Sequence, residues 1–128
     1  MVYAGLAIVL SFLQTFYHRA YMLSYYQRMP NWFLAGDNIS LPFLITAACV
    51  HAFLFLLLYA QCSKFFPGLR GGLIFGIIQA LMIFLPFSLF QMAVVDVNDL
   101  RPILGQWLNL GFLSNLVLGA ISGSLYKP

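Results

Sequence analysis

The chain has 128 residues, of which 62% are hydrophobic and only 7% are charged, and its formal net charge at pH 7 is +3. A soluble domain carries roughly 25% charged residues, so this chain lacks the polar surface that a water-soluble domain needs. Its six basic residues are scattered singly and form no cluster that follows a phosphate backbone, which argues against binding to nucleic acid. The composition indicates an integral membrane protein.

The first apolar run, VYAGLAIVLSFLQTFY, starts at Val2. It has neither the basic start nor the small-residue cleavage site of a signal peptide. We therefore expect a membrane span over about residues 2–20, with Arg19 reaching toward the interface.

An aromatic segment follows over about residues 21–40. Tyrosine and tryptophan rings combine an apolar body with a polar tip, which favours the headgroup layer of a membrane. We predict that this segment lies at the interface and that Tyr25, Tyr26 and Trp32 anchor it there.

Three more apolar runs predict spans over 41–60, 71–95 and 103–126, each long enough to cross a core of about 30 Å as a helix. The short connection QCSKFFPGLR contains the turn signal Pro67–Gly68 and predicts that the second and third helices form an antiparallel hairpin. The expected fold is all-α: a polytopic integral membrane four-helix bundle, one membrane domain over 1–128, with an interfacial aromatic segment between helices 1 and 2.

Four spans place both termini on one side of the membrane, together with Lys64 and Arg70. The two sides carry equal numbers of basic residues, but all the acidic residues fall on the other side. We expect both termini in the cytoplasm, where the positive balance is cleaner.

Small residues recur every four positions in the third and fourth runs. The stripes contain Gly72, Gly76, Gly111, Gly119 and Gly123. Because helices in lipid associate through close backbone approach, these glycines predict tight helix packing, within the chain or against a partner subunit.

Polar residues inside apolar spans are candidates for function because they are costly unless they are paired. His51 lies in the second run, Gln79 in the third and Asn115 in the fourth. Counting at about 1.5 Å per residue from the side that the three runs share places them at similar depths. We therefore predict one intramembrane polar layer, in which His51 hydrogen-bonds Gln79, Asn115 or a backbone carbonyl.

Three interpretations of His51 remain open. The first is a neutral ring that holds the helices in register. The second is an axial ligand to a haem or chlorophyll-type pigment, since Ala47, one turn before His51, leaves room for a flat macrocycle. This A-x-x-x-H arrangement resembles the one in antenna helices. The third is a polar step in the path of a small solute.

The sequence carries no acid/base pair, no metal-ligand spacing and no phosphate-binding loop, so we expect neither an enzyme nor a metal site. No deep carboxylate is present for proton or cation coupling.

Three stretches give the chain a resemblance to a family of small four-helix bacterial membrane proteins that have no assigned activity: SFLQTFYHRAY, GGLIFGIIQALMIFLP and LGAISGSLYKP. The resemblance implies the bacterial inner (cytoplasmic) membrane and no catalytic residue. We expect a small accessory or structural subunit, in contact with lipid and packed against a larger membrane complex. The alternatives are an oligomeric carrier or channel for a small solute and a subunit that binds haem or a chlorophyll-type pigment.

Overall fold

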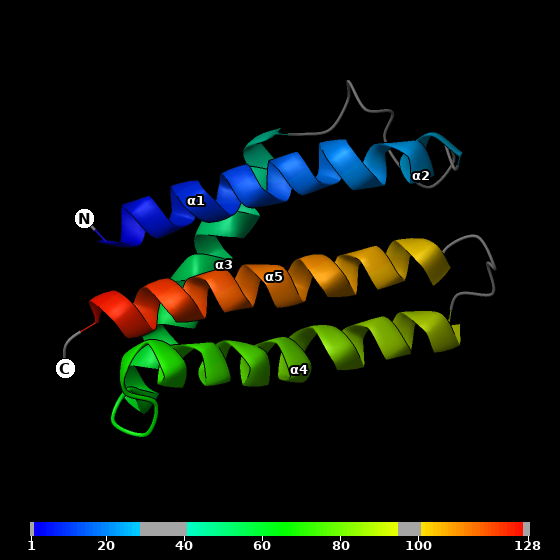
Figure 1. Cartoon of the computed structure of the whole chain (residues 1–128). Helices are drawn as coiled ribbons and strands as arrows, with labels where there is room; N and C mark the ends of the chain where they lie inside the picture. The colour runs from blue at the N-terminus through cyan, green and yellow to red at the C-terminus, as the bar shows by residue number, and fades with distance from the viewer. Residues whose placement is uncertain (1, 29–40, 95–100, 127–128) are drawn as a thin grey trace.

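The structure, a computed structural model, describes residues 2–28, 41–94 and 101–126. Within these ranges no strand occurs, and the all-α prediction is confirmed for them. The elements, shown in Figure 1, are α1 (Val2–Tyr17), a π-helical turn η1 (His18–Met22), α2 (Leu23–Arg28), α3 (Leu41–Cys62), α4 (Gly68–Val94) and α5 (Arg101–Leu125).

Three of these helices are long and apolar enough to cross a membrane. Their apolar windows are Ile45–Cys62, Gly68–Gln91 and Pro102–Leu125. The first predicted span has a different form. The 16 residues of α1 pass without a break into η1 and α2, because Tyr17 and Leu23, on either side of the π turn, both keep right-handed helical backbone angles. Residues 29–40 of the predicted interfacial segment, including its anchor Trp32, lie outside the described residues.

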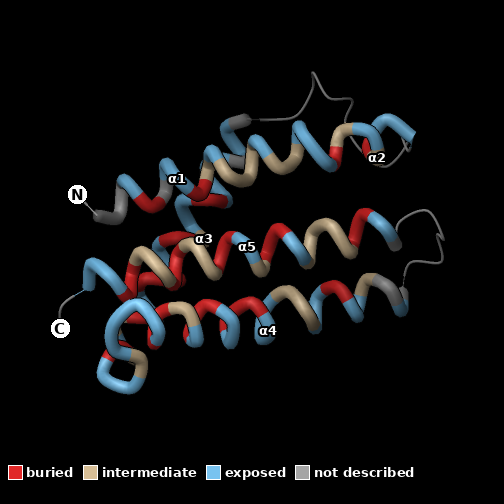
Figure 2. Tube along the Cα trace, viewed as in Figure 1, coloured by how far each residue is buried: buried red, intermediate tan, exposed pale blue. Residues whose placement is uncertain are grey.

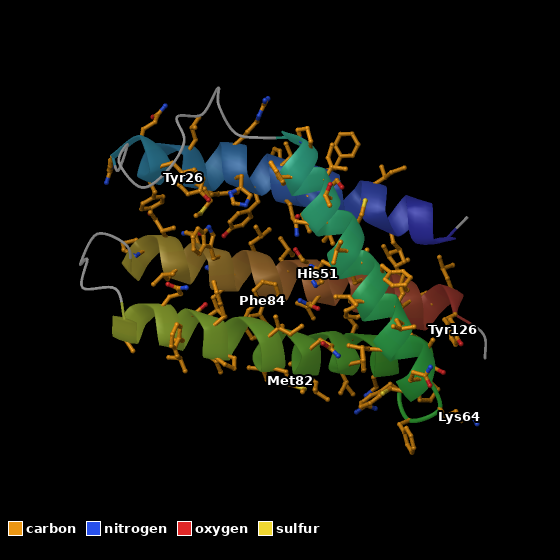
Figure 3. All side chains as sticks on the ribbon, turned by 180° about the vertical axis from the view of Figure 1, so that it is seen from behind. Tyr26, His51, Lys64, Met82, Phe84 and Tyr126 are labelled. Carbon is orange, nitrogen blue, oxygen red and sulfur yellow. The ribbon has the colours of Figure 1, made fainter. Side chains whose placement is uncertain are left out.

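The helices α4 and α5 lie side by side and antiparallel, and α1 with α2 runs along the opposite side of α5 (Figure 1). The helix α3 crosses this layer obliquely on one face, as the view from behind shows (Figure 3). The start of α1, the end of α5 and the turn between α3 and α4 all lie at the same end of the bundle (Figure 1).

Glycines explain why α4 and α5 pair so closely. A Cβ added at Gly72 would overlap the carbonyl oxygen of Gly119, and one at Gly119 would overlap that of Gly72. A Cβ added at Gly76 would overlap the carbonyl oxygen of Asn115, and one added at Gly123 would overlap that of Gly68. These predicted packing glycines are therefore used within the chain, where backbone lies against backbone.

The predicted side-by-side hairpin of the second and third helices is not what the structure contains. The connection is a tight turn, but α3 then diverges from α4 and packs mainly on α1. Ala48 and Ala52 of α3 are buried in one cluster with Leu6 and Leu10 of α1. The reason is steric: the small faces of α4 are already occupied by α5, while α3 presents its two alanines to α1.

The turn between α3 and α4 is held by specific hydrogen bonds. The Tyr59 hydroxyl donates to the Phe66 carbonyl oxygen at 2.8 Å, and the backbone amide of Phe65 donates to the Cys62 carbonyl oxygen at 2.9 Å. Gly68 then begins α4 with φ +68°, a backbone conformation that favours glycine. The Pro67–Gly68 turn signal therefore marks the point where the chain reverses.

Two apolar clusters hold the helices together. The larger one lies near the chain ends, where the four long helices meet and where buried residues are concentrated (Figure 2). In it, the Phe75 ring of α4 lies 5.3 Å from both the Phe55 and the Tyr59 rings of α3. The smaller cluster joins the π turn and α2 to the start of α5, through Met22, Tyr26 and Ile103.

Candidate functional site

An open cleft of about 630 Å³ lies between α3 and α4. Its walls are mostly apolar and include Val50 and Leu54 of α3 and Ile83 of α4, all of which are exposed. The helices α1 and α5 contribute polar residues, Gln14 and Asn115. The oblique course of α3 creates this opening, because α3 leaves α4 soon after the turn that joins them.

The three residues predicted to form a polar layer all line this cleft: His51 from α3, Gln79 from α4 and Asn115 from α5. Helices of different tilt bring them together because each lies a few turns from the shared end of the bundle. His51, Gln79 and Asn115 together form a strip of polar atoms, here called the polar strip, at the base of the mostly apolar cleft.

His51 pairs with Asn115, across 3.4 Å between Nε2 and Oδ1. The Asn115 amide nitrogen donates to the Gly111 carbonyl oxygen at 2.8 Å, which leaves Oδ1 as the acceptor and makes the His51 Nε2–H the donor. The Phe84 ring lies 5.8 Å from the His51 ring, and both are seen where α3 crosses in front of α5 (Figure 3). Of the partners predicted for His51, the structure selects Asn115.

Gln79 is the unpaired member of the strip. The residue is 8% exposed and makes no side-chain hydrogen bond within the described part of the chain. Its amide group borders the cleft, where it can donate and accept hydrogen bonds.

The described residues that line the cleft carry no formal charge, and His51 is the one titratable side chain among them. Among the described residues, no group of three or more His, Cys, Asp or Glu is close enough to hold a metal ion. A macrocycle would have His51 as its protein ligand here, with Ala47 also lining the cleft, and it would compete with Asn115 for the His51 ring.

A second polar group, which the sequence analysis missed, joins the π turn and α2 to α5. Trp107 Nε1 donates to the Tyr26 hydroxyl at 3.1 Å, and that hydroxyl lies 2.7 Å from His18 Nδ1. Close by, the Tyr17 hydroxyl donates to the Gln106 side-chain oxygen. The available signal was the adjacent polar pair at Gln106 and Trp107 in the first turns of the last helix.

This polar group includes one of the predicted interfacial anchors. Tyr26, which is expected from the sequence to lie in the headgroup layer, is only 6% exposed and packs against α5. The π turn before it rotates its side chain toward the protein. Tyr25 packs at the edge of the same cluster, and the Arg28 guanidinium lies 5.9 Å from the centre of its ring.

Comparison of the chain with protein-family models, with curated proteins and with solved structures finds no match.

Proposed function

We propose that this chain is a non-catalytic integral membrane protein with four spans, and that it binds a neutral lipophilic molecule in the cleft between α3 and α4. The observation that carries the proposal is Gln79, whose amide group makes no side-chain hydrogen bond among the described residues and borders a mostly apolar cleft.

The lining defines the ligand's chemistry. The exposed apolar walls, such as Leu54 and Ile83, match a hydrocarbon body that enters from the lipid. The Gln79 amide both donates and accepts hydrogen bonds, so it suits a carbonyl or hydroxyl group. A carboxylate or phosphate would find no charged partner among the described residues of the lining, and burying an unpaired charge is very costly. The ligand is therefore uncharged.

The proposal includes the position in the membrane. We place α1, η1 and α2 together as the first span, because they form one uninterrupted helix, and we place the protein in a bacterial inner membrane. The end that carries Lys64 and Arg70 is assigned to the cytoplasm. Reporter fusions after Tyr126 test this orientation, and a periplasmic reporter signal would reverse it.

Photo-crosslinking tests the ligand class. The protein, in lipid nanodiscs, is exposed to a diazirine-bearing fatty alcohol and, separately, to the matching fatty acid, and the modified residues are mapped by mass spectrometry. We expect the alcohol to label the cleft wall at Val50 and Leu54 in preference to Ile77 and Ile78, which face outward from α4. Equal labelling of both surfaces, or preference for the acid, would contradict the proposal.

A matched pair of variants adds a quantitative test. Gln79→Leu removes the polar partner, whereas Gln61→Leu makes the same change at an exposed position outside the cleft. One neutral hydrogen bond contributes about 0.5–1.5 kcal/mol, so cleft labelling at limiting probe should fall roughly two- to tenfold in Gln79→Leu alone.

The same preparation decides between this proposal and the other candidates. Native mass analysis would reveal a co-purifying membrane subunit, which would favour the accessory role over ligand binding. An absorption band of a haem or chlorin would identify a pigment at His51 and would replace the neutral lipid as the occupant of the cleft.

A further inference from the structure

A second, smaller and partly open space of about 190 Å³, here called the inner cavity, lies between α1, α4 and α5. It lies toward α2, because His18 and Trp107 line it, and none of its described lining residues belongs to α3. It is distinct from the ligand cleft, although Gln14 and Phe84 line both.

Three polar side chains line this inner cavity without a hydrogen bond among the described residues: Ser114, Ser88 and Gln14. Ser114 is 1% exposed, and its hydroxyl is a buried atom with no hydrogen-bond partner. Ser88 is 3% exposed, whereas Gln14 is half-buried. Buried polar atoms of native proteins have partners in the great majority of cases, so the Ser114 hydroxyl points to a polar occupant, beside which Ser88 and Gln14 also lie.

Size and charge define that occupant. A water molecule takes about 30 Å³ in the liquid, so the cavity has room for roughly half a dozen. The serine hydroxyls and the Gln14 amide supply the two to four polar contacts that a buried water needs. The described lining residues include no Asp, Glu, Lys or Arg, which disfavours an ion.

The Phe84 ring forms the wall between the two cavities. It lies over Gly111, where an added Cβ would overlap the ring atoms. The ring therefore reaches the backbone of α5 and separates the inner cavity from the strip that contains His51. Gln14 lines both the inner cavity and the cleft, so the two spaces share one polar side chain.

We infer that the inner cavity is a hydrated chamber inside the membrane region, in which Ser88, Ser114 and Gln14 hold ordered water up to the Phe84 ring. This inference does not depend on a ligand in the cleft. The water-filled chamber would lead part of the way through the protein and end at the polar residues of the cleft. A route for a small neutral solute requires such a row of polar groups.

Radiolytic hydroxyl-radical footprinting of the wild-type protein in nanodiscs tests the chamber, since radicals formed from water oxidise the residues next to that water. Phe84 is expected to be oxidised. Met82, two residues earlier on α4, is 69% exposed on the outer side of the helix (Figure 3) and should remain unmodified because it faces lipid. Phe65, 81% exposed in the turn between α3 and α4, serves as the positive control.

Methionine is intrinsically more easily oxidised than phenylalanine, which makes Met82 a strict control. If Phe65 is modified and Phe84 is not, the chamber is dry and the inference is wrong. If Met82 is modified as readily as Phe84, water reaches the lipid-facing side too, and the inference is also wrong.

A pair of serine variants locates the water. Ser114→Val replaces the unpaired hydroxyl with methyl groups and should abolish the oxidation of Phe84. Ser124→Val makes the same change at an exposed position near the end of α5 and should leave Phe84 oxidation unchanged. Persistent oxidation of Phe84 in a folded Ser114→Val protein would show that the water lies elsewhere and would overturn the assignment. If Ser114→Val does not fold, the wild-type comparison of Phe84 with Met82 decides alone.

Discussion

The contact between α4 and α5 makes a sharp prediction about glycine. In Gly119→Ala, the new Cβ would lie more than about 1 Å inside the normal contact distance of the Gly72 carbonyl oxygen. Both groups belong to the backbone, so no side-chain rotation relieves the overlap and the helices must move apart. Overpacking of this kind costs about 1–3 kcal/mol.

Gly105→Ala is the matched control. It lies in the same helix, but an added Cβ would meet no atom within 4 Å. Both substitutions share the stabilisation of about 0.5–1 kcal/mol that alanine brings to a helix, so their difference isolates the steric cost. Gly119→Ala should therefore be less stable than Gly105→Ala by about 1–3 kcal/mol, which is roughly 5- to 150-fold in the unfolding equilibrium constant.

The measurement is reversible unfolding in mixed micelles, in which sodium dodecyl sulfate is titrated and helix content is followed by circular dichroism. The double variant Gly72→Ala/Gly119→Ala should cost less than the two single changes added, because one separation of the helices relieves both overlaps. Equal stability of Gly119→Ala and Gly105→Ala would refute the close backbone contact.

Three further substitutions test individual hydrogen bonds by the same unfolding titration. Tyr59→Phe removes the bond to the Phe66 carbonyl and should cost about 0.5–1.5 kcal/mol; an unchanged midpoint would mean that the bond does not hold the turn. Tyr26→Phe removes the hydroxyl that contacts His18 and should cost about 1–3 kcal/mol, with a change in tryptophan fluorescence; a wild-type spectrum and stability would argue against this network. Asn115→Leu removes the partner of His51 together with the bond to the Gly111 carbonyl oxygen, and we expect a loss of about 0.6 kcal/mol for each bond, the average for such bonds in membranes; a gain in stability would contradict the pairing.

The sequence predicts the positions of the helices well because each helix corresponds to a long apolar run. Apolar runs of about 20 residues with few charges have one stable form in lipid. The fixed rise of a helix also explains why counting along three runs places His51, Gln79 and Asn115 around one cleft. The depth of a residue along a helix depends only on its position in the sequence, so one sequence is enough to estimate it.

The rotation and tilt of each helix cannot be counted along the sequence in this way. The short link between α3 and α4 suggests neighbours over their whole length, yet Gly72 and Gly119 give α4 a closer partner in α5. The choice between two possible neighbours depends on the shapes of all the faces, which spacing alone does not describe. For the same reason, the pairing of Tyr26 with Trp107 was beyond sequence reasoning, because it depends on a local change in helical twist.

That change in twist is the π turn from His18 to Met22. A π turn is equivalent to one extra residue inserted into an α-helix, and each residue of an α-helix turns the chain by about 100°. Deleting Ala20 should therefore restore a regular α-helix and swing everything beyond it, Tyr26 included, onto a different face. A single inserted residue therefore turns the Tyr26 side chain onto the face where it joins the first helix to the last.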